Sequence, residues 1–515
     1  MTWVSAAVVD TRPPAGRAVE SRHGEVVTAK LRARLATRMP GDRLRGWIVT
    51  GLVTAFGAIL RLIGLTHPKG FIFDEVYYPQ DARQMLMHGV EWDVNSNSGS
   101  FVAHPPFGKW CISIGEWLFG YNEFGWRIPS VVAGVVSILL ITRLARRLTG
   151  STVLGATAGL LLSMDGMHFV LSRAGLLDIF LMVFILASFY CLVLDRDARR
   201  RRWLRALDTG IDPSKQRPPF SIPWWRIASA VLLGLAMGVK WSALWYIILF
   251  VALIFVWEWR LRRLVGAAHP LRDAFIDEIG WLFLFGAIVV AVYLATWTGW
   301  FLSDDGYYRH WLRDNHQSEP PVIGPLINLW HYHMDVLHFH DTLSSPHTYQ
   351  SWPWQWMLDI RPVVFFWSPD VDCGAKECAS EVLMLGTPLL WWAFLPSIIA
   401  LVWWAVAHRD WRAWGILGAA AAGIVPWLAY PDRTMFFFYA LPAVPFLVLA
   451  VVFALGMIIG PPKSSPERRL SGSLIAAGIV ILIALCFVYF YPIFTGQPIT
   501  NDDWHARMWL DNRWI

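Results

Sequence analysis

The chain has 515 residues, of which 56% are hydrophobic and 16% are charged, and its formal net charge is +6. Soluble proteins carry roughly 25% charged residues, so this composition excludes an ordinary soluble enzyme and indicates an integral membrane protein. The 32 Trp suit the aromatic belts at membrane interfaces, although aromatic rings also stack on sugar faces.

Apolar runs recur along the chain. A transmembrane helix needs about 20 predominantly apolar residues, and the sequence predicts about eleven such spans. A break at Lys240-Trp241-Ser242 favours a pair of spans over one long segment. The sequence therefore predicts an all-α polytopic membrane protein. The expected spans lie near residues 46–66, 128–147, 152–169, 174–194, 227–243, 244–259, 278–298, 383–406, 412–429, 435–459 and 472–491.

The basic residues predict the orientation, because positively charged loops stay on the cytoplasmic side. The amino-terminal segment, residues 1–45, has no apolar run of signal-peptide length and is expected to be cytoplasmic. The carboxyl-terminal tail, residues 492–515, is expected outside. Most of the 44 Lys and Arg fall in the predicted cytoplasmic segments 1–45, 143–150, 195–226, 257–278, 408–413 and 460–471.

The first outer loop, residues 67–127, lies between the spans and carries two adjacent carboxylates, Asp74 and Glu75. Charged groups at a membrane surface are costly unless they perform chemistry, so this pair predicts an active site there. The same loop contains the block His104-Pro105-Pro106-Phe107-Gly108-Lys109. Other unusual polar residues fall on the same side: Arg127, Arg173, Asp178, Lys240 and Arg433.

A second outer segment, residues 299–382, joins the spans 46–298 to the spans 383–491. Long loops are usually functional, so we expect it to cap the site, with half-helices around 307–315 and 325–340. Its histidines could bind a metal or line an aqueous groove on an amphipathic helix. The chain has no HExxH motif, and the groove is favoured. These histidines are His331, His333, His338, His340 and His347.

Two of the five cysteines, Cys373 and Cys378, share this outer segment. The outer space should be oxidising, which favours a structural disulfide between them. The other three lie in or beside apolar runs and are expected to be small buried side chains.

The sequence has no P-loop and no soluble domain long enough to fold around a nucleotide. A group transfer outside the membrane would therefore need a donor delivered through the bilayer as a lipid phosphate. Such a site needs a carboxylate to take a proton from the acceptor and cations to hold the departing phosphate. Both are present in the outer loops.

Five blocks resemble the protein O-mannosyltransferases in order and spacing, from residue 70 to residue 440. The resemblance implies a GT-C fold of glycosyltransferase family 39. It also implies the compact bacterial form, because residues 299–382 are too few for β-trefoil repeats, and the seven Lys among 44 basic residues suggest the actinobacterial type. The blocks are Phe73-Asp74-Glu75 with Tyr77-Tyr78, the His104–Lys109 block, Gly125-Trp126-Arg127-Ile128-Pro129-Ser130, Leu171-Ser172-Arg173-Ala174-Gly175-Leu176-Leu177-Asp178 and Gly238-Val239-Lys240-Trp241-Ser242.

The resemblance implies transfer of mannose, with inversion, from a polyprenyl monophosphomannose to Ser or Thr of secreted proteins. Asp74 would be the base, and Glu75 would position the acceptor or the sugar. Arg127 would have a structural or phosphate-side role beside them. Further candidates for the donor are Lys240, Arg173, Lys109, Arg433 and His104. Asp178 is expected to pair with Arg173 and hold the outer end of the fourth span.

The implied donor is a decaprenyl- or dolichyl-type phosphate mannose, with no obligatory metal or other cofactor. The expected partners are unfolded Ser/Thr/Pro-rich secreted proteins, membrane lipid and the Sec translocon, with no nucleic acid. The expected location is the plasma membrane, with the active site outside the cytoplasm. The alternative enzyme is a GT-C transferase with a lipid or polysaccharide acceptor. A transporter is disfavoured, because the chain shows no internal repeat.

Overall fold

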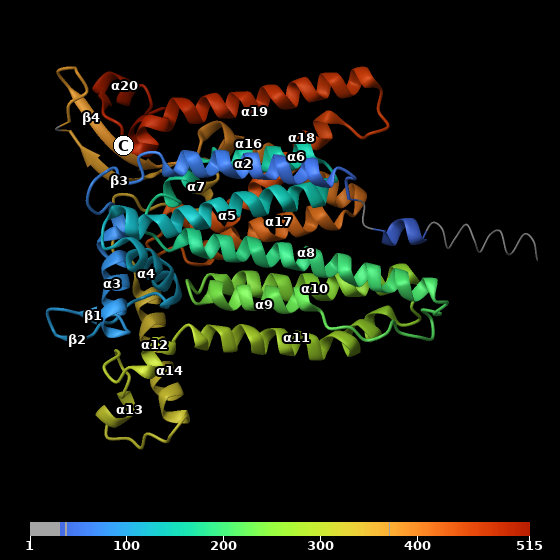
Figure 1. The fold of residues 1–515 in the computed structure, drawn as a ribbon, viewed down its shortest axis with the longest axis horizontal. Coiled ribbons are helices and arrows are strands. Elements are labelled where there is room, and N and C mark those ends of the chain that lie inside the picture. Colours follow the sequence, from blue (N-terminus) through green and yellow to red (C-terminus); the bar gives the residue numbers. More distant parts are fainter. Residues whose placement is uncertain (1–30, 37–38, 370, 515) are drawn as a thin grey trace, which may run out of the picture.

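A computed structural model describes residues 31–36, 39–369 and 371–514. The chain is mostly helical, and its long helices run side by side in one bundle (Figure 1). Most of the expected cytoplasmic segment, residues 1–45, lies outside the described residues.

Within the described residues, nine helices are long and apolar enough to cross a membrane. The expected spans 152–169 and 227–243 are instead shorter apolar helices of 12 and 14 residues, α6 (Thr152–Ser163) and α9 (Trp224–Met237). At 1.5 Å per residue each is shorter than a hydrocarbon core of about 30 Å, so the count of eleven full-length spans is not confirmed. The long helices are α2 (Arg43–Leu62), α5 (Glu123–Thr149), α8 (Asp178–Asp208), α10 (Ala243–Val265), α11 (Pro270–Ala295), α16 (Pro388–His408), α17 (Trp411–Ile424) with η2 (Val425–Ala429), η3 (Phe437–Ala443) with α18 (Val444–Ile459), and α19 (Pro466–Thr495).

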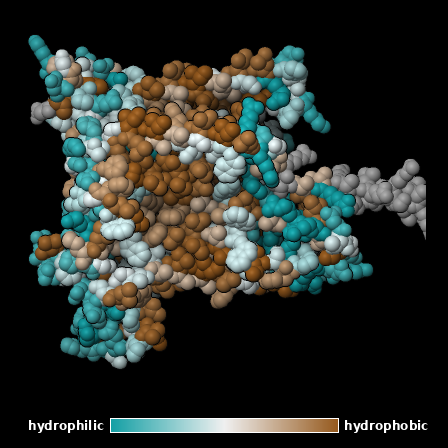
Figure 2. All heavy atoms as spheres, in the orientation of Figure 1, coloured by the Kyte–Doolittle hydropathy of each residue, from teal (hydrophilic) through white to brown (hydrophobic). Residues whose placement is uncertain are grey.

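The bundle buries its helices unequally. α8 and α18 are the most enclosed of the long helices, whereas α2, α11 and α19 present most of their apolar side chains outward. Figure 2 shows the resulting apolar belt between two polar ends. An apolar surface of this kind is stable only in lipid, so the chain is a multi-pass membrane protein.

The two ends of the bundle differ. At one end, which we call the η1 end, lie η1 (Phe73–Val76), α3 (Tyr78–His88), α4 (Phe107–Phe119) and α7 (Gly166–Leu171), on the left of Figure 1. The opposite end, the far end, carries the connection from α8 to α9 and the connection from α10 to α11.

The outer segment 299–382 packs at the η1 end, where it also forms strands that the all-α prediction missed. β3 (Val363–Ser368) pairs antiparallel with β4 (Cys378–Met384), and β4 pairs with β5 (Ile499–Thr500) of the tail. The run Val363-Val364-Phe365-Phe366-Trp367 is rich in β-branched and aromatic residues, which was the available signal. The segment's helices are α12 (Thr298–Leu302), α13 (Trp311–Asp314), α14 (Ile323–Thr342) and α15 (Pro353–Trp356), and β1 (Trp92–Asp93), β2 (Ser98–Gly99) and α20 (Asn501–His505) complete this end.

β4 also explains why the helix of the eighth expected span starts later than predicted. All seven residues of β4 are buried, and its last three, Val382-Leu383-Met384, are apolar and lead through Leu385 toward the apolar run of α16. The helix begins at Pro388 rather than near 383, because Pro is favoured in the first turn of a helix. Cys373 and Cys378 form a disulfide in the β3–β4 connection.

Candidate active site

The turn η1 positions Asp74 at the η1 end. Phe73, the residue before it, has a positive φ of 46°, which is unusual for a side chain with a Cβ. Its ring stacks on Phe365 of β3 at 4.6 Å between centroids and meets the edge of Phe438 at 5.8 Å. These aromatic contacts hold Phe73 in its strained conformation and thereby fix the direction of the next residue.

The Asp74 carboxylate is largely enclosed, and within the described residues no group donates a hydrogen bond to it. Burial raises its pKa to about 6, the Lys240 ammonium lowers it in part, and the Asp178 carboxylate raises it. The three charges therefore share one region. A carboxylate with a pKa near 6 and no hydrogen bond to its oxygens can accept a proton near neutral pH.

Glu75, its neighbour, points away into the protein and is fully buried beside Arg127. Arg127 donates to both carboxylate oxygens, with Nε–Oε1 at 2.9 Å and Nη2–Oε2 at 2.8 Å. Its remaining N–H groups bond the carbonyls of Leu65, Pro68 and Gly70. All five donors of Arg127 are thus used, which leaves none for a donor phosphate.

Both carboxylate oxygens of Glu75 also accept hydrogen bonds from backbone amides. Its Oε2 accepts from the Ile72 amide at 3.0 Å, and its Oε1 accepts from the Gly175 amide at 2.8 Å. The Glu75–Arg127 pair therefore joins η1, the loop after α2, the α7–α8 connection and α5. This geometry holds Asp74 in place rather than presenting Glu75 to a sugar.

The expected pair of Asp178 with Arg173 does not form. Arg173 instead donates to the carbonyls of Arg61 and Ile63, each at 2.7 Å, and of Gly64 at 2.9 Å. It caps the carboxyl end of α2, where helix carbonyls lack partners. Asp178 pairs with Lys240, whose Nζ lies 2.9 Å and 2.8 Å from the two oxygens.

A cavity of about 250 Å³ opens beside this pair. Lys240 sits at the break between α9 and α10, and its Nζ also lies 5.8 Å from the ring centroid of Tyr439. The amide of Phe107 donates to the Gly238 carbonyl at 3.0 Å, so the His104–Lys109 block is tied to the same break. Residues that line the cavity include His104, Asp178, Lys240, Trp241, Leu244, Trp245, Leu337, His340, Asp341, Trp427, Tyr430, Arg433 and Tyr439.

Arg433 and His340 form the other polar wall of the cavity. Arg433 contacts the His340 carbonyl through Nη1 and His340 Nδ1 through Nη2, the latter at 3.1 Å. His340 Nε2 bonds the Ala103 carbonyl at 2.9 Å, so Nε2 carries the proton and Nδ1 accepts. Burial and the nearby Arg433 charge lower the pKa of His340 to about 4, which keeps it neutral.

Arg433 pairs with no carboxylate among the described residues, and its buried Nε has no hydrogen-bond partner there. Lys240, by contrast, is already paired with Asp178. Of the two cations that line the cavity, Arg433 thus keeps an uncompensated charge for an anionic ligand.

Lys109 is not at the cavity. Its side chain is 1% exposed, forms an ion pair with Glu91, lies 3.8 Å from Asp81 and donates to the His104 carbonyl at 3.3 Å. His104 lines the cavity, and its ring stacks on His340 at 5.4 Å. Burial and the surrounding cations lower the pKa of His104, so it too is neutral.

The histidine-rich stretch forms α14, the expected amphipathic helix. His331 stacks on Trp311 and His333 bonds Tyr293 at 2.6 Å, whereas His340 faces the cavity. No group of three or more His, Cys, Asp or Glu within the described ranges is arranged to hold a metal ion. The helix therefore supplies one wall of a groove.

The sequence missed the aromatic lining from η2 and η3, namely Trp427, Tyr430 and Tyr439. Tyr430 adjoins the Pro431-Asp432-Arg433 turn, and aromatic residues beside a polar turn between apolar runs were the available signal. Such residues could also belong to an interfacial belt, and only the folded arrangement separates the two roles.

Comparison with known proteins shows which family the chain resembles. A family model described as dolichyl-phosphate-mannose-protein mannosyltransferase matches residues 103–209, and one described as the C-terminal four TMM region of protein-O-mannosyltransferase matches residues 325–514. The chain resembles the structure of the S. cerevisiae protein O-mannosyltransferase Pmt1-Pmt2 complex bound to the sugar donor. That match has a TM-score of 0.72 at 15% identity and covers 93% of this chain and 94% of that chain, which shows a shared GT-C fold.

Sequence relatives extend over nearly the whole chain. It is 41% identical to a polyprenol-phosphate-mannose–protein mannosyltransferase of Mycolicibacterium smegmatis (strain MKD8), over 92% of this chain and 93% of the relative. It is 35% identical to the protein of the same name from Corynebacterium glutamicum, over 89% and 92%. The chain therefore belongs to the protein O-mannosyltransferase family.

Proposed function

We propose that this protein transfers mannose from a polyprenyl monophosphomannose to Ser or Thr hydroxyls of secreted, unfolded proteins. The η1 end, with Asp74 and the cavity, would face outside the cytoplasm in the cell membrane. The arginine-rich segments 195–226 and 257–278, which combine helix ends with the α8–α9 and α10–α11 connections at the far end, support this orientation, since basic segments stay in the cytoplasm.

In the proposed step, the acceptor hydroxyl oxygen forms a bond to C1 of mannose as the bond from C1 to the phosphate oxygen breaks. Asp74 takes the hydroxyl proton, and the electron pair of the broken bond leaves with the polyprenyl phosphate. Attack opposite the leaving group inverts a β-linked donor into an α-mannoside. Asp74 supplies general base catalysis, and cations at the cavity stabilise the leaving phosphate.

We assign the cavity to the donor. Arg433 would contact the phosphate, Lys240 would remain paired with Asp178 beside it, and the neutral His104 would offer a hydrogen bond, whereas His340 would hold Arg433 in place. Trp241, Leu244 and Trp245 would receive the first isoprene units. Arg127, Arg173 and Lys109 would act as structural residues, because their donors are already used.

The observation that carries the proposal is Asp74, an enclosed carboxylate with no hydrogen-bonded partner among the described residues, in the same region as a cation-bearing cavity. The test incubates purified protein in lipid nanodiscs with polyprenyl-phospho[³H]mannose and a Thr/Pro-rich peptide. Label on the peptide, released by α-mannosidase, is expected. Label that appears on lipid alone would instead identify a lipid-acceptor transferase.

The pH dependence of transfer should report Asp74. Because its pKa is raised to about 6, the base loses its activity as pH falls through that value. The acceptor kcat/KM should fall tenfold per pH unit below about pH 6 and reach a plateau above it. A pH–rate profile from pH 4.5 to 8 checks this. A plateau that extends down to pH 4.5 would contradict the assignment.

Arg433→Gln should weaken use of the donor, because it removes the charge that no carboxylate compensates. We expect KM for polyprenyl phosphomannose to rise by at least about tenfold, the scale of one charge-assisted phosphate contact. The matched control is Arg313→Gln, which removes an exposed arginine from the same end of the protein. Equal KM values for the two variants would remove Arg433 from the donor site.

Chelators should leave transfer unchanged. A monophosphate leaving group carries less charge than the diphosphate for which divalent ions are usually required, and Arg433 and Lys240 supply positive charge at the cavity. Initial rates after dialysis against EDTA are compared with rates after Mg²⁺ or Mn²⁺ is added back. Loss of activity that either ion restores would show that the reaction uses a metal.

A further inference from the structure

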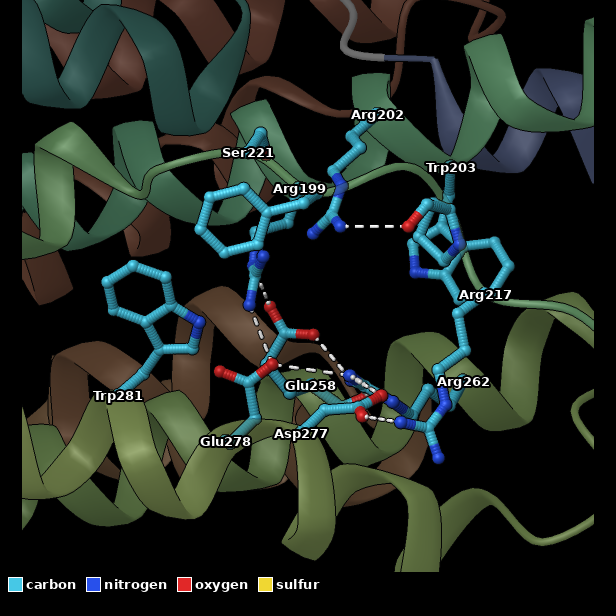
Figure 3. Close-up of a pocket in the computed structure, with 12 residues that line it drawn as sticks. Arg199, Arg202, Trp203, Arg217, Ser221, Glu258, Arg262, Asp277, Glu278 and Trp281 are labelled. Carbon is cyan, nitrogen blue, oxygen red and sulfur yellow. Dashed lines mark hydrogen bonds and ion pairs between the residues drawn. The ribbon is translucent and has the colours of Figure 1, made fainter.

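A second charged cavity, drawn in Figure 3, lies at the far end, away from the end that carries Asp74. It encloses about 220 Å³ between α8, α10, α11 and the α8–α9 connection. Positive charge in these segments is enough to orient the protein in the membrane, and a folded cavity adds nothing to that orientation. Its construction therefore calls for a separate explanation.

The inner wall is a network of buried ion pairs. Glu258 accepts from Arg199 Nε and from Arg262 Nη1, each at 2.7 Å. Glu278, which is fully buried, accepts from Arg199 Nη2 at 2.6 Å and from Arg262 Nη2 at 3.2 Å. Arg226 of α9 also contacts both carboxylates and pairs with Asp195. Because each glutamate bridges three arginines, this wall is close to neutral and joins α8, α9, α10 and α11 rigidly.

The rim is different. Arg202 donates to the carbonyls of Pro219 at 2.6 Å and Pro218 at 3.0 Å, and no carboxylate within the described ranges pairs with it. Arg217 contacts Asp277, and its side chain is 56% exposed. The lining thus contains four arginines against three carboxylates, and the excess positive charge lies at the opening.

Aromatic side chains flank this opening. Phe220 and Trp281 stack at 6.0 Å with an angle of 23° between their planes, and Phe220 is 77% exposed. Figure 2 shows that the far end is where the apolar belt gives way to polar surface. Exposed aromatic rings at this boundary between apolar and polar surface lie at the level of the lipid headgroups.

We propose that this cavity binds the phosphate group of an anionic phospholipid, with Arg202 and Arg217 as the contacting residues. Arginine forks match phosphate oxygens, and basic pockets between transmembrane helices hold lipid headgroups in this way. The volume admits a phosphodiester with several waters. Phe220 and Trp281 lie against the glycerol and the first acyl carbons. A soluble phosphate presents the same chemistry to the arginines.

The experiment measures ligand binding to the purified full chain in neutral detergent by native mass spectrometry. The probes are dioctanoyl phosphatidylglycerol, dioctanoyl phosphatidylcholine and inorganic phosphate. The variants are Arg202→Gln and Arg217→Gln. The matched control is Arg201→Gln, which removes the exposed charge next to Arg202 on the same helix and outside the cavity.

One phosphatidylglycerol should bind at least tenfold more tightly than phosphatidylcholine. Arg202→Gln should weaken that binding by tenfold or more, and Arg201→Gln by less than twofold. Inorganic phosphate that binds as tightly as phosphatidylglycerol would support the arginine site and assign it to a soluble ligand. Equal binding of both lipids, or equal effects of Arg202→Gln and Arg201→Gln, overturns the proposal.

Folding and catalysis are followed separately. Arg202 contacts only backbone carbonyls of one connection, so Arg202→Gln should keep the Tm of the control in lipid-free detergent. Arg217→Gln changes an exposed side chain and should also weaken phosphatidylglycerol binding. Mannosyl transfer in that detergent should match the control for both variants, because the cavity lies at the other end of the bundle. Lipid binding that both variants retain overturns the proposal whatever their Tm.

Discussion

Asp74→Asn should lower mannosyl transfer by about 10²- to 10⁴-fold, the contribution of a positioned general base. Asn has the same shape and cannot take the hydroxyl proton. The stacking of Phe73 on Phe365 does not depend on the carboxylate, so the fold and the donor cavity should survive. Single-turnover transfer to a Thr-containing peptide, with saturating donor, measures the chemical step.

The matched control is Asp81→Asn, which changes another enclosed carboxylate of the same loop. Burial also raises the pKa of Asp81 to about 6, but its neighbours are Lys109 and Glu91 rather than the cavity. We expect Asp81→Asn to retain transfer within about tenfold. Transfer by Asp74→Asn at the rate of Asp81→Asn would refute the base assignment, provided that both variants bind the donor.

Glu75→Ala should be the most destabilising single change at the η1 end. It leaves the Arg127 guanidinium buried without its carboxylate, and breaking a buried pair costs roughly 3–5 kcal/mol. The amides of Ile72 and Gly175 also lose their acceptor. The free energy of unfolding is measured by SDS titration in mixed micelles, with circular dichroism as the signal.

Two further variants complete this test. Glu123→Ala removes a partly exposed carboxylate at the start of α5 that accepts from the Gly70 amide, and it should cost only about 1 kcal/mol. The double variant Glu75→Ala with Arg127→Ala should lose less unfolding free energy than the two single variants together, because each single variant leaves a buried charge without its partner. Strict additivity would mean that Glu75 and Arg127 do not act as a pair.

The sequence predicted the family, the fold class and the polar groups of the η1 end, because those features are local. Asp74, Lys240 and the His104–Lys109 block lie at breaks between apolar runs, where hydropathy alone marks them.

Partners across the bundle could not be predicted in this way. The charge of Arg173 is visible in the sequence, but its neighbours are the carbonyls at the end of α2, about 110 residues earlier. Arg433 has the same residue type and keeps its charge available at the cavity. Whether an arginine already bonds other groups of the protein depends on long-range packing, and a single sequence carries no periodic signal for such packing.

The contact between Phe73 and Phe365 has a consequence for biosynthesis. Ribosomes make the chain from its amino end, so Asp74 enters the bilayer region long before β3 exists. The ring that holds Phe73 at positive φ comes nearly 300 residues later. A nascent protein that has inserted only its early helices therefore carries Asp74, the proposed base, before the ring that fixes its direction has been made, and mannosyl transfer should begin only after translation has passed β3.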